Sequence, residues 1–200
     1  MIFTNKKIGK SAYASLTQDG QLIISGTGRI QSSADNAPST IELFFFTYAW
    51  DKNKDAIKSV VVEDGITNVP ACAFMNYPNL EKVVLPASVK TIEQYAFQDC
   101  RMLKEVIMQN GVEVIEKNAF CGCQRLANAL LPNTVKKIEE SAFRKCGALQ
   151  SVVIPASVQT IGMRAFVSAQ EILVKGKASE AEFVSICDNW QCLANVLYEK

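Results

Sequence analysis

Apolar residues recur along this chain at a fixed interval of 23 positions. The clearest column is phenylalanine, and each of its members follows an alanine. Its members are Phe74, Phe97, Phe120, Phe143 and Phe166. A second column begins at Ile57 and continues with leucine, from Leu80 onward. A period between about 20 and 50 residues is typical of a solenoid, in which each repeat packs only on its neighbours. The spacing therefore predicts a stack of equivalent coils with continuous apolar ladders inside.

Each repeat divides into three segments, which the second repeat, 80–102, illustrates. Residues 83–86 are β-branched and end at a proline, so they predict a short strand. Residues 89–92 predict a second extended or turning segment. Residues 93–97 have better helix propensity and predict one or two turns of α or 3₁₀ helix. One strand per coil, stacked in register, predicts a parallel sheet along one side of a rod.

We expect one continuous domain with an N-terminal capping segment at 1–56, five repeats over 57–174 and a C-terminal cap at 175–200. Caps are needed because an open solenoid exposes its core at both ends. Residues 12–30 predict a β-hairpin with Asp19-Gly20 as its turn, and the aromatic residues of 41–50 are expected to cover the first coil. Ser179 and Glu182 have capping-box spacing. The helix they predict places one face over the last coil: Phe183, Ile186, Cys187 and Trp190.

The repeat reads Leu-x-x-Val-x-(Ile/Leu)-Pro-x-x-Val-x-x-Ile-x-x-x-Ala-Phe-x-x-Cys, and it resembles the repeat of BspA-type leucine-rich repeat proteins over about 57–174. The segment from Leu16 to Gly28 resembles the hairpin that often precedes such repeats. The segment from Ser179 to Trp190 resembles the short helix that often closes them. The resemblance implies an α/β solenoid, a right-handed superhelix with its parallel sheet on the concave face. It also implies a bacterial surface or secreted protein that binds proteins or host matrix and has no catalytic residues.

Composition excludes several function classes. The net charge is +1, so no overall field attracts nucleic acid or anionic lipid. No apolar run reaches about 18 residues, so no membrane span is expected. The start of the chain lacks the basic-then-apolar order of an export signal. Location is therefore open: the family resemblance points to the cell surface, whereas the missing signal and unpaired thiols point to the cytoplasm.

Histidine is absent, which removes the commonest general base and metal ligand. Among the 7 cysteines, Cys100, Cys123 and Cys146 share one column. Parallel side chains on stacked coils do not converge, so we expect buried free thiols there and no disulfides. Whether Cys187 and Cys192 pair is open.

Cys121-Gly122-Cys123 is a lone C-x-C. A zinc site needs four ligands, usually in two pairs, and no second pair has this spacing. We therefore expect no metal and no cofactor, with Cys121 exposed. The acidic column of Glu93, Glu116 and Glu139 is expected to hold solvated charges at the start of each helical turn, where the helix dipole favours them.

The strand surface is the strongest candidate for a binding site. If Val83 and Leu85 point inward, Val84 points outward, and its column is apolar throughout: Val61, Val84, Ile107, Leu130 and Val153. Strands about 4.8 Å apart make this a stripe of about 20 Å on the concave face. Contiguous exposed apolar surface usually marks a partner site. A mixed polar rim flanks it: Ser59, Lys82, Glu105, Asn128 and Ser151.

These observations favour a non-catalytic interaction module that presents its sheet face to a protein or a glycan, with host adhesion implied by the resemblance alone. The alternative is a thiol-redox or metal-binding protein that uses Cys121 and Cys123. A third option is an architectural repeat within a longer assembly, against which the predicted caps argue. Oligomeric state is open, although an apolar stripe makes dimerisation possible.

Overall fold

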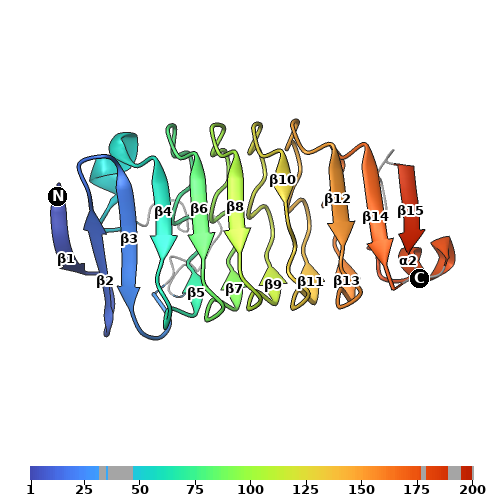
Figure 1. The fold of residues 1–200 in the computed structure, drawn as a ribbon, viewed down its shortest axis with the longest axis horizontal. Coiled ribbons are helices and arrows are strands. Elements are labelled where there is room, and N and C mark those ends of the chain that lie inside the picture. The colour runs from blue at the N-terminus through green and yellow to red at the C-terminus, as the bar shows by residue number, and fades with distance from the viewer. Residues whose placement is uncertain (32–34, 36–46, 177–178, 189–194, 200) are drawn as a thin grey trace.

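The computed structural model describes residues 1–31, 35, 47–176, 179–188 and 195–199. These residues form a rod of stacked coils, with the two ends of the chain at opposite ends of the rod (Figure 1). Each coil adds one strand to a large sheet and most add a two-residue strand to a smaller one. The predicted stack of coils is therefore confirmed.

The large sheet is parallel throughout the repeats. Its strands pair in register, so that Val60 lies opposite Val83 and Val83 opposite Val106. Its first part contains β4 (Ser59–Val62), β6 (Lys82–Leu85), β8 (Glu105–Met108) and β10 (Asn128–Ala129). Its second part contains β12 (Ser151–Ile154), β14 (Glu171–Lys175) and β15 (Asn195–Glu199). The strand ladder is interrupted between β10 and β12, which are not joined in either sheet.

The small sheet forms from the segments that the sequence predicted to be extended or turning. It is also parallel, with residues such as Ile92 and Ile115 opposite one another. Its strands are β5 (Asn68–Val69), β7 (Thr91–Ile92), β9 (Val114–Ile115), β11 (Lys137–Ile138) and β13 (Thr160–Ile161). The fold is therefore a β-solenoid with two parallel sheets.

The predicted helical turns within the repeats are wrong. Residues 93–97 form a non-helical turn in which Tyr95 has φ of +60°, a left-handed conformation that ends a right-handed helix. Equivalent residues of the other repeats are left-handed as well: Cys72, Asn118, Ser141 and Arg164. The described helices, η2 (Asp51–Ala56) and α2 (Glu180–Val184), lie outside these turns. The α/β class is thus corrected to a β-solenoid.

The Ala-Phe turns form the third side of each coil. The Phe97 N–H donates to the Ala119 carbonyl oxygen of the next coil at 2.8 Å, and Phe120 and Ala142 repeat the contact. The phenyl rings stack, with centroids 5.2 Å apart for Phe97 and Phe120 and planes only 7° from parallel. Because the alanine is small, neighbouring coils approach closely enough for both contacts. The predicted phenylalanine ladder is confirmed.

At the N-terminal end, β2 (Ala12–Leu16) and β3 (Gln21–Gly26) form the predicted antiparallel hairpin. Thr17 N–H donates to the Gln21 carbonyl, so the loop spans residues 18–20, longer than the two-residue turn predicted. β3 pairs in parallel with β4. A further strand that the sequence did not predict, β1 (Phe3–Lys7), pairs antiparallel with β2.

The aromatic cover of the first coil is described only in part, because residues 41–46 lie outside the described residues. Trp50 is fully buried and stacks on Phe74 with ring centroids 5.5 Å apart. Tyr48 stacks on Trp50 in turn, at 5.1 Å. These two side chains continue the aromatic ladder beyond the first Phe.

At the C-terminal end, Ser179 Oγ accepts the Glu182 N–H at 3.4 Å and begins α2, as the capping-box spacing predicted. Phe183 is buried, whereas Trp190 and Cys192 lie outside the described residues. Cys187 then forms an isolated parallel β-bridge with Ile161 of β13, which adds one more row to the small sheet.

Candidate functional site

The apolar column chosen from the sequence does face outward from the large sheet. Val83 and Leu85 are buried on either side of Val84, which is only half-buried. Exposure along the rod is highest at Leu130 and lower on both sides of it. The exposed fractions are 39% for Ile107, 76% for Leu130 and 38% for Val153, while Val61 is half-buried like Val84.

The stripe is longer than the sequence indicated. Strand pairing places Ile23 of β3 opposite Val61, and places Leu173 of β14 opposite Val153. Leu197 of β15, which is 43% exposed, lies opposite Leu173. The sequence analysis did not identify Ile23, Leu173 and Leu197, because these residues lie outside the 23-residue register. Only the parallel pairing of β3, β14 and β15 with the repeats identifies them. We call the full set the outward stripe: Ile23, Val61, Val84, Ile107, Leu130, Val153, Leu173 and Leu197.

Leu130 lies where the strand ladder is interrupted. β10 has two residues, whereas β6, β8 and β12 have four. Asn128 and Ala129 have low strand propensity compared with the Lys-Val pair of β6, which accounts for the shortening. A surface hollow of about 590 Å³ opens beside Leu130, with Met108, Gln109 and Pro132 among its walls. The outward stripe is thus most exposed next to a recess.

The rim beside the stripe is polar and nearly neutral. Lys82 Nζ and Glu105 Oε2 form an ion pair at 2.8 Å across neighbouring strands. Both side chains are about half exposed, at 47% and 51%, so the pair adds little to stability. Asn128 is exposed in the next row. The sheet face therefore offers an aliphatic centre with weak charge around it.

The cysteine ladder holds buried free thiols, as predicted. The Cys100 thiol donates to the Phe74 carbonyl oxygen of the preceding coil at 2.9 Å, and Cys123 and Cys146 make the equivalent contact at 3.2 Å. Burial raises the pKa of the Cys100 thiol to about 12. These thiols serve as internal donors and are kept protonated.

Cys121 is half-buried, so the expected exposure of its side chain is only partly met. Burial, with a smaller contribution from Asp99, raises its pKa and disfavours the reactive thiolate. Cys123 points into the core, so the two thiols of the C-x-C segment do not share a surface. Within the described ranges, no group of three or more acidic, cysteine or histidine side chains could hold a metal ion. The redox and metal alternative gains no support.

The glutamate column is not solvated as expected. Glu93 is buried and accepts from Arg29, Asn68 and the Ala71 N–H. Glu116 accepts the Gln94 N–H at 2.9 Å, and its pKa is raised chiefly by burial. The expectation failed because it assumed helix N-termini. In the observed turn, the backbone N–H of Gln94 in one coil needs an acceptor, and the Glu116 carboxylate of the next coil supplies it.

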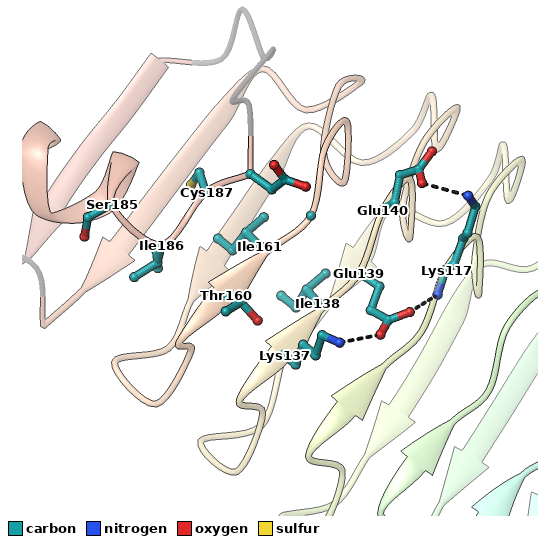
Figure 2. Close-up of a pocket in the computed structure, with 12 residues that line it drawn as sticks. Lys117, Lys137, Ile138, Glu139, Glu140, Thr160, Ile161, Ser185, Ile186 and Cys187 are labelled. Carbon is teal, nitrogen blue, oxygen red and sulfur yellow. Dashed lines mark hydrogen bonds and ion pairs between the residues drawn. The ribbon is translucent and has the colours of Figure 1, made fainter.

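A second hollow, of about 520 Å³, lies beside the small sheet near its C-terminal end. Figure 2 shows Lys117 and Lys137 paired with neighbouring glutamates. Lys117 Nζ binds Glu140 and Lys137 Nζ binds Glu139, each at 2.7 Å. At the far end the Cys187 thiol donates to Phe183, and burial raises its pKa to about 12. The hollow therefore offers neither an activated thiol nor an unpaired lysine.

Among the described residues, no helix has the length and apolar character that crossing a membrane requires. Two features distinguish this molecule: the ladders of equivalent side chains on successive coils, and the outward stripe.

The family model for the BspA-type leucine-rich repeat region matches residues 45–172, in 6 copies. Among solved structures, the chain is similar to a leucine-rich repeat protein from T. pallidum, with 28% identity, a TM-score of 0.57, and coverage of 82% of this chain and 69% of that one. A leucine-rich repeat protein from Bacteroides ovatus is similar at 16% identity and a TM-score of 0.55, over 97% of this chain and 55% of that one.

A leucine-rich repeat protein from Eubacterium ventriosum is similar at 21% identity and a TM-score of 0.53, over 95% of this chain but only 38% of that one. At these identities the Bacteroides and Eubacterium likenesses show the fold alone. Among curated proteins, no sequence matches this chain. The family match covers more than half of the sequence, and the chain therefore belongs to the BspA-type leucine-rich repeat family.

Proposed function

We propose that this chain is a non-catalytic interaction module that binds a protein partner through the outward face of its large sheet. The observation that carries the proposal is the outward stripe, which runs from β3 to β8 and Leu130 and resumes on β12, β14 and β15, on a surface that the solenoid does not need to bury. The contact residues are Val61, Val84, Ile107, Leu130 and Val153, with Lys82, Glu105 and Asn128 as the rim. The proposal takes this sheet as the concave side of a right-handed rod with capped ends, as the family resemblance implies.

A protein suits this face better than a glycan. Sugar rings are usually held by aromatic side chains together with polar groups, and all members of the outward stripe are aliphatic. Aliphatic side chains instead bury well against apolar side chains of another protein, at roughly 25 cal/mol per Å² of apolar surface. The recess beside Leu130 would receive a protruding side chain of the partner.

Location at a bacterial surface, and host adhesion in particular, are extensions of the same proposal. One structural neighbour is a pneumococcal vaccine antigen, similar at 21% identity, a TM-score of 0.58 and coverage of 72% of this chain and 42% of that one. An exposed stripe on a rigid rod suits contact with another protein surface, since the rod loses little conformational entropy on binding.

The test places a photoreactive phenylalanine analogue at position 107 or 130 and identifies the proteins that crosslink in cells. The partner found is then purified and its affinity measured for Ile107→Ser/Leu130→Ser. We expect at least a tenfold loss of affinity with nearly unchanged thermal stability, because both side chains are already solvent-exposed in the free protein.

Val167→Ser is the matched control, because Val167 is 40% exposed, as Ile107 is, but lies on the Ala-Phe turn side of the rod. A photoreactive group at 167 should not capture the same partner. Equal loss of affinity in the control, or binding of purified glycans that the double variant does not weaken, would move the site elsewhere.

A further inference from the structure

We propose that Asn110 undergoes spontaneous deamidation, in which the backbone nitrogen of Gly111 displaces the side-chain amide and water then leaves an aspartate or an isoaspartate at position 110. The site lies in the turn between β8 and β9 (Figure 1), on the edge of the recess beside Leu130. This inference concerns the chemistry of one turn and is independent of the partner proposed for the sheet face.

The reaction requires only water as a co-reactant. The Gly111 nitrogen attacks Cγ of Asn110 and gives up its proton, and ammonia leaves from Cγ, so that a cyclic succinimide forms. Water then opens the ring at one carbonyl group to give an aspartate, or at the other to give an isoaspartate, in which the main chain passes through the former side chain. The sum converts the amide and water into a carboxyl group and ammonia, with no oxidation. Groups that the chain holds next to one another react far faster than separate molecules do.

The attacking group is not engaged in a hydrogen bond. Among the described residues, the Gly111 N–H has no acceptor. In the first repeat the equivalent N–H, that of Gly65, donates to Ser88 Oγ of the next coil at 3.0 Å. Thr134 holds the corresponding position beside Gly111, but its hydroxyl donates to the Val112 carbonyl oxygen at 2.8 Å. Glycine also has no side chain to shield its nitrogen.

The amide that leaves is also unrestrained. Asn110 is exposed, and its side chain makes no hydrogen bond within the described part of the chain. Asparagine in a turn commonly bonds to the backbone, which would hold the amide away from the next nitrogen. Asn133 occupies the equivalent position in the next coil and is exposed as well, but the β-branched Thr134 follows it and crowds the attacking nitrogen. Reaction is therefore expected at Asn110 and not at Asn133.

Two aspartate–glycine pairs would form the same ring, and a hydrogen bond holds the nitrogen of each. The Gly20 N–H donates to the Thr17 carbonyl oxygen at 3.3 Å, and the Gly65 N–H is held by Ser88. The sequence contains a single asparagine–glycine pair, at 110–111. An unshielded pair and an unoccupied N–H thus coincide in this turn.

The contact between neighbouring coils requires a glycine here. A Cβ atom at Gly111 would lie 2.0 Å from the carbonyl oxygen of Ala87 in the preceding coil, so a larger residue would push the coils apart. The same contact separates the two products. An aspartate leaves the main chain unchanged, whereas an isoaspartate adds a methylene group to it and shifts Gly111 relative to Ala87. We therefore expect the isoaspartate form to be the less stable of the two.

Both products place a carboxylate in a recess whose lining residues are uncharged. Asn110 forms part of its wall together with Met108 and Leu130. A partner side chain that enters the recess would have to remove water from the new charge, which is unfavourable, so the modified protein should bind the partner less tightly. This consequence rests on the proposed function, whereas the deamidation does not, and the affinity of Asn110→Asp for the partner tests it separately.

The test follows the folded full chain during several weeks of incubation at near-neutral pH and body temperature. Peptide mapping by mass spectrometry detects the exchange of amide for carboxylate, and an isoaspartyl methyltransferase detects isoaspartate. We expect Asn110 to react at least about tenfold faster than Asn133, because Thr134 crowds the latter site. The rate at Asn110 should lie within about tenfold of its rate in the chain unfolded by guanidinium chloride, because the turn leaves both reacting groups unoccupied.

Two variants isolate the cause. Asn110→Gln keeps an uncharged amide but would have to close a larger ring, so modification of this peptide should disappear while circular dichroism and thermal melting stay those of the parent chain. Ser88→Ala removes the acceptor of the Gly65 N–H and should increase isoaspartate at Asp64 several-fold, because the freed nitrogen can then attack.

The proposal is wrong if the folded chain keeps its amide at Asn110 while the unfolded chain loses it. Equal rates at Asn110 and Asn133 would contradict it as well, since the free N–H of Gly111 would then give no advantage. A Ser88→Ala chain with no more isoaspartate at Asp64 than the parent chain would show that hydrogen bonding of the nitrogen does not control the attack.

Discussion

The indole N–H of Trp50 donates to the carbonyl oxygen of Ala73 at 3.0 Å. One coil further along, the equivalent oxygen of Ala96 receives its hydrogen bond from the backbone N–H of Phe74. Trp50 also stacks on Phe74, as each Phe ring stacks on the next. A single side chain thus supplies both the ring and the donor that a preceding Ala-Phe turn would have given.

Replacing Trp50 should separate these two contributions. We expect Trp50→Phe to lower the free energy of unfolding by about 1–3 kcal/mol, because the ring remains while the buried Ala73 carbonyl loses its donor. Trp50→Ala should cost about 3–5 kcal/mol, because the stack is lost as well. Urea unfolding followed by circular dichroism measures both. No loss in Trp50→Phe would mean that the hydrogen bond contributes nothing, and equal losses in the two variants would mean that the ring stack contributes nothing.

The buried thiols make stability fall at high pH. Burial raises the pKa of Cys100 and of Cys146 to about 12, from an ordinary value of 9.0. Above pH 9.0 the unfolded chain loses protons that the folded chain retains. The contribution of these thiols to the free energy of unfolding should therefore be constant below pH 9.0 and should decrease as the pH rises toward about 12.

The measurement is urea unfolding at a series of pH values from 8 to about 10.5. Each buried thiol can contribute up to about 1.4 kcal/mol per pH unit to the slope. Cys100→Ala/Cys146→Ala should be less stable at pH 8 but should show a shallower decline. The slope is the diagnostic readout, because lost packing lowers stability equally at every pH. An unchanged slope would contradict the protonated, buried state of these thiols.

The ladders were predictable from the sequence because a fixed period places equivalent side chains at equivalent points of every coil. Phe97 and Phe120 are 23 positions apart and stack at 5.2 Å. The same reasoning identified Val84 and Ile107 as outward neighbours, which the pairing of β6 with β8 confirms. Periodicity could not extend the stripe to Ile23, because β3 enters the sheet through a hairpin with a different spacing.

The first of the two left-handed positions in each turn gives little sequence indication of its conformation. Only Asn118 there is a residue type enriched at positive φ, whereas Tyr95 and Arg164 have no such preference. The other position, two residues after the Phe, holds Asn76, Asp99 and Gly122, which do tolerate it and could have indicated a turn in place of a helix. The acceptor role of the glutamates depended on that turn, so it was missed together with it.

Partial burial in this turn destabilises the charged form of Glu116. Its folded-state pKa is raised above 4.5, chiefly by burial, so this group favours the folded state most below that pH. The contribution is lost as the pH rises through the folded-state pKa. At neutral pH the charge is held in a partly dry site, although it satisfies the Gln94 N–H.

Glu116→Gln should therefore be at least as stable as the parent chain at pH 7, since an amide oxygen still accepts from Gln94 without a charge. At pH 4 its relative advantage should disappear. Glu116→Ala leaves the Gln94 N–H unpaired and should lose about 1–3 kcal/mol at pH 7. Chemical unfolding of the three proteins at both pH values is the measurement. A glutamine variant clearly weaker than the parent at pH 7 would show that the charge is favourable here.

The interruption of the strand ladder at β10 has an identifiable cause. Ala129 occupies the inward column that holds valine in β4, β6, β8 and β12. Its side chain is small and almost buried, at 6% exposed. Both its low strand propensity and its small volume weaken contact with β12 on the next coil.

Ala129→Val should close this interruption. The added methyl groups fill the column and favour an extended backbone, so we expect a gain of about 0.5–1 kcal/mol in the free energy of unfolding. Backbone amides of β12 should exchange with deuterium more slowly as hydrogen bonds to β10 form. Ala127→Val is the control, because residue 127 is exposed and cannot fill the interior. If the two variants slow exchange equally, strand propensity alone is responsible. If Ala129→Val is destabilising, the inward column at this coil has no room, and the interruption is a packing requirement that keeps Leu130 exposed beside its recess.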